Sequence, residues 1–224
     1  MRMVSGNDRR PGHRASAREV AADMSDAPVL GLPDWVYSDP DFYQRELEKV
    51  LLPSWQVVCH ETDLPRAGDY QRLDFAGRPI IVVRGEDRRL RAFYNVCRHR
   101  AARLLDGDDS GRGHCDRLRI ICPYHGWTYD LEGGLRGIPD RGDYAGLELS
   151  RWGLKSPEIE IWQGFVFVRC RPGGPSVSRI MEPFEESIAA YRIPEMTALG
   201  RITLRPRAVN WKTVVENYAD GLHV

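Results

Sequence analysis

Short runs of strand-type residues, many with alternating apolar and polar positions, dominate the middle of the chain. Turn residues separate runs at 55–59, 69–75, 79–84, 90–95, 118–122 and 127–131. Residues 158–168 indicate two further strands, broken at Gln163-Gly164, and a Pro- and Gly-rich boundary follows at residues 171–175. This regular spacing predicts antiparallel sheets. We therefore expect a mainly β domain over residues 54–171, an antiparallel β sandwich.

Helical spacing lies on both sides of this β region. Ser38-Asp39-Pro40 offers a helix cap with a first-turn proline, and apolar residues then recur at i, i+4, i+7 and i+8 before Pro53. This pattern predicts an N-terminal helical segment within residues 30–53. After the boundary, we expect a helix near residues 178–191, a strand near 200–205, and a second domain that begins at about residue 176 and runs to Val224.

The amino-acid composition argues against several classes of partner and cellular location. The 224 residues include 32 Lys+Arg and 32 Asp+Glu, so neither nucleic acid nor an acidic membrane surface is an indicated partner. Five cysteines, an odd number, argue against a disulfide framework and for a reducing compartment, and no apolar stretch approaches the length of a membrane span. Residues 1–29 resemble neither a signal peptide nor a clean transit peptide. We expect a disordered leader and a cytoplasmic protein.

Two short motifs carry the candidate chemistry. Cys97-Arg98-His99 and Cys122-Pro123-Tyr124-His125 each combine one cysteine with one histidine. Two thiolates and two neutral imidazoles are the ligand set of a Rieske [2Fe–2S] cluster, which transfers single electrons. A tetrahedral zinc site accepts the same residue types. The apolar and aromatic residues around the second motif favour a shielded cluster, whose potential depends on burial.

Other histidines and cysteines compete for these roles. His114 and Cys115 lie between the two motifs, but no histidine follows Cys115 at the required spacing. Cys59 and Cys170 sit in apolar runs and are interpreted as packed core residues. We therefore prefer Cys97, His99, Cys122 and His125 as ligands.

The residues around these motifs resemble the Rieske non-haem iron oxygenases, that is, the α subunits of ring-hydroxylating dioxygenases and related monooxygenases. The resemblance runs from about Trp35 to Val224 and is strongest at residues 95–100 and 122–130. Ala101 stands where that family usually has Gly, which predicts that the loop accepts ordinary dihedral angles there. The 22 residues between His99 and Cys122 form a longer insert than usual. Its polar, Gly-rich residues 106–113 predict an exposed loop.

The resemblance also assigns roles outside the cluster ligands. It implies an α+β catalytic domain that starts within residues 176–224, after the β domain. There Asp220 matches a carboxylate that bridges to a cluster histidine, and His223 matches the first histidine of a mononuclear Fe(II) site. Arg100 is a candidate hydrogen-bond donor to the bridging sulfides, and Trp127 a candidate shield against water. The alternative for Asp220 and His223 is a helix whose surface carries both residues at i, i+3.

The resemblance implies an oxidoreductase that takes electrons from a separate reductase or ferredoxin. The family passes them to iron for O₂-dependent hydroxylation of an aromatic or related organic substrate, and some members attack a C–H bond of a quaternary amine. Aromatic hydrocarbon catabolism and a homotrimer or higher oligomer follow as expectations. The chain stops one residue after His223, so we expect this fragment to lack oxygenase activity. Two alternatives are a Rieske ferredoxin-like carrier and a zinc-binding module.

Overall fold

The computed structural model describes residues 31–196 and 208–221, which form two compact units. Within these ranges, residues 31–40 and 209–221 belong to one unit, and residues 41–196 with Ala208 belong to the other. The predicted leader, the predicted strand at 200–205 and His223 lie outside the described residues. The larger unit also contains residues 176–196, so the boundary between the two domains stays a prediction.

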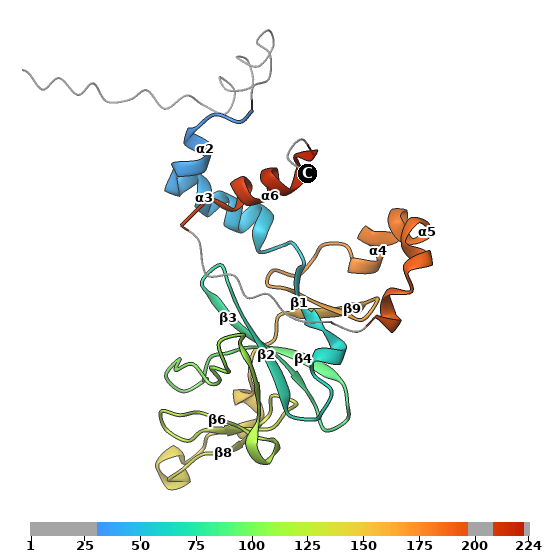
Figure 1. The fold of residues 1–224 in the computed structure, drawn as a ribbon. Helices are drawn as coiled ribbons and strands as arrows, with labels where there is room; N and C mark the ends of the chain where they lie inside the picture. The colour runs from blue at the N-terminus through green and yellow to red at the C-terminus, as the bar shows by residue number, and fades with distance from the viewer. Residues whose placement is uncertain (1–30, 197–207, 222–224) are drawn as a thin grey trace, which may run out of the picture. The chain divides into compact units, whose positions relative to one another are not determined.

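Three antiparallel sheets build the larger unit (Figure 1). Their orders are β1-β10-β9, β4-β3-β2-β5 and β6-β7-β8. The strands are β1 (Gln56–His60), β2 (Asp69–Phe75), β3 (Arg78–Arg84), β4 (Leu90–Tyr94), β5 (Arg112–His114), β6 (Ile120–Ile121), β7 (Thr128–Tyr129), β8 (Leu135–Gly137), β9 (Glu158–Trp162) and β10 (Phe165–Arg169). The predicted mainly β fold class is confirmed.

Strand β3 separates two hydrophobic cores, because successive side chains of a strand point to opposite faces. Ile81 and Val83 pack into a core that also contains Cys97 and Cys122. Ile80 and Val82 pack into a second core, with Cys59 and with residues of β10. All four β3 side chains are fully buried. The candidate ligand cysteines therefore lie inside the packed interior of the larger unit.

Two hairpins turn through pairs of residues with left-handed backbone. Ala76 and Gly77 connect β2 to β3 with φ of 50° and 72°, and Gln163 and Gly164 connect β9 to β10 with φ of 50° and 81°. Such two-residue turns match the right-handed twist of the strands they join. The predicted break between two strands at Gln163-Gly164 is confirmed.

Strand β5 corrects the expectation of an exposed loop that continues through residue 113. Arg112 and Gly113 pair with Gln71 and Tyr70 of β2. A Cβ atom at Gly113 would collide with the Tyr70 ring, so the glycine lets the two strands approach. A three-residue strand that contains glycine has no apolar alternation, which is why the sequence pattern did not indicate it.

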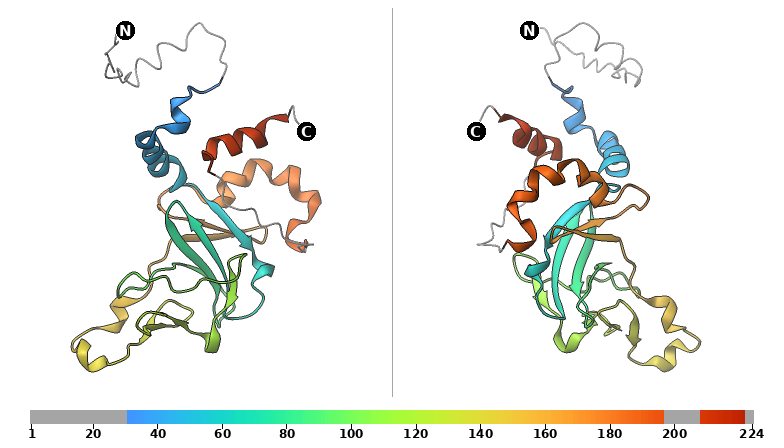
Figure 2. Two further views of the ribbon diagram at one scale, coloured as in Figure 1. Left: turned by 60° about the vertical axis from the view of Figure 1, so that its left-hand side comes forward. Right: turned by 90° about the vertical axis from the view of Figure 1, so that its right-hand side faces the viewer.

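The helices are short and lie outside the sheets (Figures 1 and 2). The predicted N-terminal helix is confirmed, although its last turn, Leu47–Leu51, is π-helical. The predicted helix near 178–191 is divided between α4, α5 and 3₁₀ turns. The helices are α2 (Trp35–Ser38), α3 (Pro40–Glu46), α4 (Val177–Met181), α5 (Glu185–Ile188) and α6 (Trp211–Ala219), and 3₁₀ turns span Glu61–Asp63, Asp116–Leu118, Arg141–Tyr144, Leu149–Trp152, Glu182–Phe184, Ala189–Tyr191 and Ile193–Glu195.

Side-chain contacts join α2 to α6 in the smaller unit. Asn210 caps α6 by accepting a hydrogen bond from the Lys212 N–H (3.1 Å), and its amide donates to the Tyr37 carbonyl (3.0 Å). The Tyr37 hydroxyl donates to the Glu216 carboxylate (2.6 Å), and the buried Lys212 ammonium lies 5.4 Å from the Tyr37 ring centroid. No helix among the described residues is both long and apolar enough to cross a membrane.

Candidate metal centre

The two candidate ligand motifs form loops with the same backbone pattern. In the first loop, the Ala101 N–H donates to the Cys97 carbonyl (3.1 Å), and the Cys97 N–H donates to the Ala102 carbonyl (2.8 Å). In the second, Gly126 and Trp127 make the equivalent bonds with Cys122, at 3.0 and 2.8 Å. One loop follows β4, and the other joins β6 to β7. The sheets therefore hold the two cysteines in equivalent backbone settings.

Ala101 does not have the ordinary dihedral angles that its side chain predicted. Its φ is 56°, and Gly126, at the same place in the second loop, has a φ of 67°. Both residues are in the left-handed region, which glycine enters readily and alanine enters only with strain. The expectation was wrong because the hydrogen bonds that close this loop require that conformation.

The thiols of Cys97 and Cys122 are close together and buried, each residue being 3% exposed. Burial raises the pKa of the Cys97 thiol, and the neighbouring Cys122 thiol also raises it, whereas the Tyr129 hydroxyl and the His99 backbone lower it. The Tyr129 hydroxyl lies 3.4 Å from the Cys97 sulfur and accepts a hydrogen bond from the Arg98 N–H (3.1 Å). The sequence did not indicate this role of Tyr129, because the aromatic residues of this segment were interpreted only as a shield of the cluster against water.

The imidazoles of His99 and His125 also form a pair, with ring centroids 4.9 Å apart. The Nδ1 atom of His99 is buried and has no hydrogen-bond partner among the described residues. Burial lowers the pKa of His99, and so do the neighbouring charges of His125 and Arg100. A neutral imidazole with an unpaired, buried nitrogen has the form that a metal ligand requires.

Aromatic rings cover this histidine pair. Trp127 is 2% exposed and stacks on His99, with centroids 4.9 Å apart and planes only 4° apart. Tyr124 lies against His125 with a centroid separation of 3.7 Å, and both of these side chains are exposed. Trp127 therefore covers one face of the His99 ring, whereas His125 is open to the surface.

The donors are grouped in two pairs. In the described ranges, no three His, Cys, Asp or Glu side chains are grouped so that all of them fit around one metal ion. A [2Fe–2S] cluster of the Rieske type needs two thiolates on one iron and two imidazoles on the other. The paired thiols, the paired rings and the orphaned His99 nitrogen fit that group.

Asn95 supports the first loop and was not singled out from the sequence. Its side chain is fully buried, its oxygen accepts from the N–H groups of Leu104 (3.3 Å) and Leu105 (2.9 Å), and its amide donates to the Leu105 carbonyl (2.5 Å). A polar residue on the buried face of a predicted strand is the signal that points to such a role. Asn95 therefore ties the end of β4 to the far end of the ligand loop.

The remaining candidate residues lie elsewhere. Arg100 is exposed and lines clefts beside His99, so its role toward the sulfides stays a prediction. Asp220 is exposed at the end of α6, in the smaller unit, whereas the four ligand candidates belong to the larger unit, so its role stays a prediction. The His114 ring bonds to the Asp69 carboxylate at 2.8 Å. Cys115 is buried in the same core as Cys97 and Cys122.

Comparisons with known proteins agree with this geometry. Residues 54–156 match the family described as Rieske [2Fe-2S] domain. The carnitine monooxygenase oxygenase subunit of Escherichia coli K12 is 33% identical over 194 residues, which cover 86% of this chain and 50% of that protein. The biphenyl 2,3-dioxygenase α subunit of Rhodococcus jostii RHA1 is 31% identical over 157 residues, which cover 70% of this chain and 33% of that protein.

A crystal structure of the apo form of the quaternary ammonium Rieske monooxygenase CntA superposes with a TM-score of 0.76 at 31% identity, covering 86% of this chain and 55% of that one. The chain spans about half the length of the carnitine monooxygenase subunit, the more similar of the two relatives. The Rieske domain implies a [2Fe–2S] cluster. On its motifs, fold and relatives, the chain belongs to the family of Rieske non-haem iron oxygenase α subunits.

Proposed function

We propose that this chain is the electron-transfer part of a Rieske oxygenase α subunit. Cys97 and Cys122 would hold one iron of the cluster, and His99 and His125 would hold the other. The observation that carries this proposal is the buried thiol pair beside an imidazole pair with an orphaned ring nitrogen. When bound, the cluster takes up and releases one electron at a time.

The residues around the candidate ligands affect the access of water, the reduction potential and the local charge. Buried Trp127 excludes water from the face of the His99 ring on which it stacks. The Tyr129 hydroxyl is placed to donate a hydrogen bond to the Cys97 sulfur, which raises the reduction potential by stabilising the more negative state. Exposed His125 places one edge of the candidate site at the protein surface. Arg100 lies close enough to His99 to add positive charge to the site.

The complete subunit uses these electrons for O₂-dependent hydroxylation of an organic substrate, with Asp220 as the carboxylate that bridges to a cluster histidine and His223 as a ligand of the mononuclear iron. We propose a quaternary ammonium substrate in place of the aromatic one expected from the sequence. The carnitine enzyme matches 86% of this chain, whereas the biphenyl enzyme matches 70%, and the solved structure described above is that of a quaternary ammonium monooxygenase. A reductase or ferredoxin supplies the electrons, and the subunit is a homotrimer or a higher oligomer.

The cluster assignment is tested by iron and sulfide analysis together with the reduction potential. The purified chain is expected to contain two irons and two acid-labile sulfides, with a potential between about −150 and +300 mV. A potential near about −400 mV would indicate a cluster held by four cysteines, and bound zinc without sulfide would indicate a zinc module. Either result would contradict the proposal.

The wider function is tested on the protein as its native cell makes it. A mass well above 25.6 kDa, with three irons per chain, is expected for an oxygenase subunit. Oxygen consumption should then depend on carnitine or glycine betaine rather than biphenyl. The ferredoxin-like carrier would be favoured if the native protein has the same mass as this chain, contains two irons and shows no substrate-dependent oxygen uptake.

A further inference from the structure

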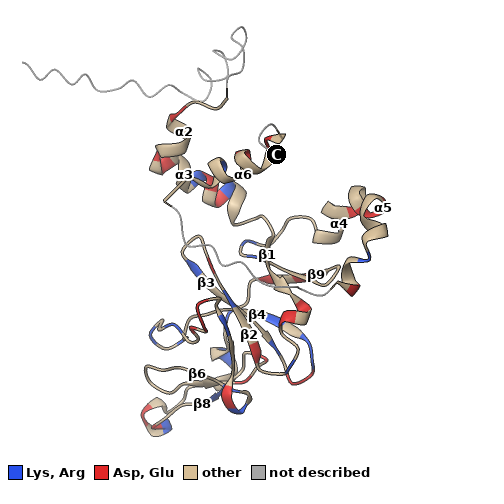
Figure 3. Ribbon diagram, in the orientation of Figure 1, with Lys and Arg blue, Asp and Glu red and all other residues tan. Residues whose placement is uncertain are grey.

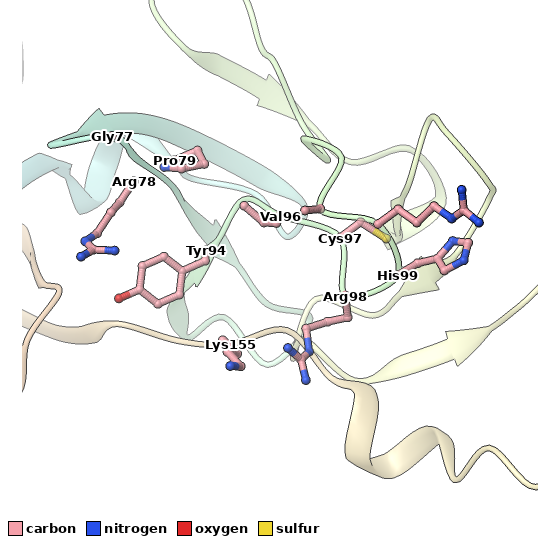
Figure 4. Close-up of a pocket in the computed structure, with 11 residues that line it drawn as sticks. Gly77, Arg78, Pro79, Tyr94, Val96, Cys97, Arg98, His99 and Lys155 are labelled. Atoms are coloured by element: carbon pink, nitrogen blue, oxygen red, sulfur yellow. The ribbon is translucent and has the colours of Figure 1, made fainter.

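We propose that a basic cleft beside the Cys97 loop is the docking site for an acidic segment of the electron-donor protein. This inference rests on the proposed electron-transfer function and adds the place and the chemistry of the donor's contact. The cleft has a volume of about 600 Å³ and lies against the backbone of the first ligand loop (Figure 4). Its cationic residues are Arg78, Arg98, Arg100 and Lys155.

The charged residues that line this cleft are all cationic. Four cationic side chains line it, and its lining includes no carboxylate. By contrast, a cleft beside His125, which Arg100 also lines, contains Asp140 and Asp143, and a third cleft, around His114, contains Asp63, Asp69 and Asp108 with two arginines. Figure 3 shows both acidic and basic residues scattered over the elements of the larger unit. An acidic partner is therefore attracted to the basic cleft and repelled by the acidic residues of the other two.

The cations of the cleft also lack carboxylate partners in the described part of the chain, although the Arg98 guanidinium lies 5.7 Å from the Trp152 ring centroid. Within residues 31–196 and 208–221, none of the four forms an ion pair with a carboxylate, whereas Arg103 pairs with Asp74 (2.9 Å) and Arg91 with Asp87 (2.8 Å). The Nε atom of Arg98 is buried and has no hydrogen-bond partner in these ranges. Guanidinium groups bind carboxylates through paired hydrogen bonds. The described part of the chain leaves this capacity unused.

The position of the cleft suits an electron donor. Cys97 and His99, one candidate ligand of each iron, line it together with the cations. Figure 4 shows the side chains extending from Arg78, past Tyr94, to the loop that carries Cys97 and His99. A protein segment bound here lies directly against the ligand loop. The contact therefore shortens the path between the donor's own redox group and the cluster.

The exposure of the cations favours a protein segment over a small buried anion. Arg78, Arg100 and Lys155 are exposed, so their charge acts on solvent at the mouth of the cleft. Exposed charges of one sign steer an oppositely charged protein and raise its association rate about 10- to 1,000-fold at low salt. This effect falls with ionic strength because the Debye length shrinks from about 30 Å at 0.01 M salt to about 3 Å at 1 M.

The test uses charge reversal on the cluster-loaded chain. Arg78→Glu and Lys155→Glu are compared with Lys49→Glu, an exposed cation outside the cleft with no ion pair among the described residues. The probe is a reduced plant-type ferredoxin, whose potential of about −400 mV allows it to reduce a Rieske cluster. Stopped-flow spectroscopy measures the second-order rate constant. At about 20 mM NaCl we expect each cleft variant to react at least about tenfold more slowly than the wild type.

At about 0.5 M NaCl this difference should disappear, and Lys49→Glu should stay within about twofold of the wild type throughout. The cluster potential and the iron content should be unchanged in all variants, which separates a docking defect from a failure of the cluster assignment. Equal rate constants for all variants, or no salt-sensitive reaction with ferredoxin, would overturn the docking site. So would inhibition by inorganic phosphate beyond that of NaCl at equal ionic strength, which would indicate a small-anion pocket.

Discussion

A left-handed residue four positions after the cysteine closes both ligand loops. In the second loop this residue is Gly126, and in the first it is Ala101. A left-handed conformation costs a residue with a Cβ atom about 1–2 kcal/mol relative to the ordinary helical region. The first loop therefore stores strain that the hydrogen bonds around Cys97 and Asn95 hold in place.

Replacing Ala101 by glycine should relieve that strain. We expect Ala101→Gly to stabilise the cluster-loaded protein by up to about 1 kcal/mol, because part of the gain is offset by the greater freedom of glycine in the unfolded chain. Ala102→Gly, at a position without positive φ, should instead destabilise it. Urea denaturation measures both changes. Equal destabilisation by the two variants would show that the left-handed backbone at Ala101 carries no strain.

Replacing either of two exposed histidines, His125 and His114, by alanine should give opposite results. His125→Ala removes an imidazole of the pair and should abolish the EPR signal of the reduced Rieske cluster. His114→Ala breaks only a hydrogen bond to Asp69 and should leave the signal intact. A signal that survives His125→Ala and is lost in His114→Ala would reverse the ligand assignment.

At the scale of elements, β5 shows how one close contact adds a strand to a sheet. Gly113 pairs with Tyr70, and the tyrosine ring occupies the space where a side chain at position 113 would lie. The insert between the two motifs is thereby attached to β2 instead of extending freely into solvent. This attachment also positions His114 opposite Asp69.

The Gly113→Ala variant should detach or distort β5. We expect a loss of about 1–3 kcal/mol in the free energy of unfolding, because the new methyl group overlaps the Tyr70 ring. Gly142→Ala is the matched control, since nothing lies within 4 Å of a Cβ atom at that position. Both are measured by urea denaturation. Equal stability of the two variants would contradict the close approach of β5 to the Tyr70 ring.

At the scale of the whole molecule, a buried thiol makes stability depend on pH. Burial, together with the charges of Asp116 and Asp69, raises the pKa of Cys115 from 9.0 to about 12. The unfolded chain therefore releases this proton at lower pH than the folded one. The stabilising contribution is complete below about pH 9 and is lost as the pH rises through about 12.

The urea midpoint should accordingly fall between about pH 9 and pH 12, and Cys115→Ala should show a shallower decline than the wild type. The folded protein should also resist alkylation of Cys115 by iodoacetamide at pH 8, because the thiolate is the reactive form. Identical pH slopes for the two proteins, or rapid alkylation of the folded chain, would contradict the buried, neutral thiol.

The strands were predictable where apolar residues alternate or run together, as in β3, and where a turn pair such as Gln163-Gly164 marks the break. β5 and β8 were not, because three residues that include a glycine carry too little pattern. The pairing of Cys97 with Cys122 and of His99 with His125 agrees with the motifs, although the assignment of these residues as ligands stays a prediction. The contributions of Tyr129 and Asn95 needed coordinates, because each acts on a residue that the sequence pattern does not connect to it.

The sequence by itself determined the family, the mainly β fold and the identity of the ligand candidates, because these follow from local composition and from short, fixed spacings. Only the tertiary structure decided the left-handed backbone at Ala101 and the basic cleft that joins Arg78 to Lys155. The hydrogen bonds that close the ligand loop set the backbone at Ala101, and the cleft arises because packing brings together residues that are far apart in the chain. The role of each of these charges and dihedral angles depends on neighbouring residues in the fold, which the local sequence pattern does not indicate.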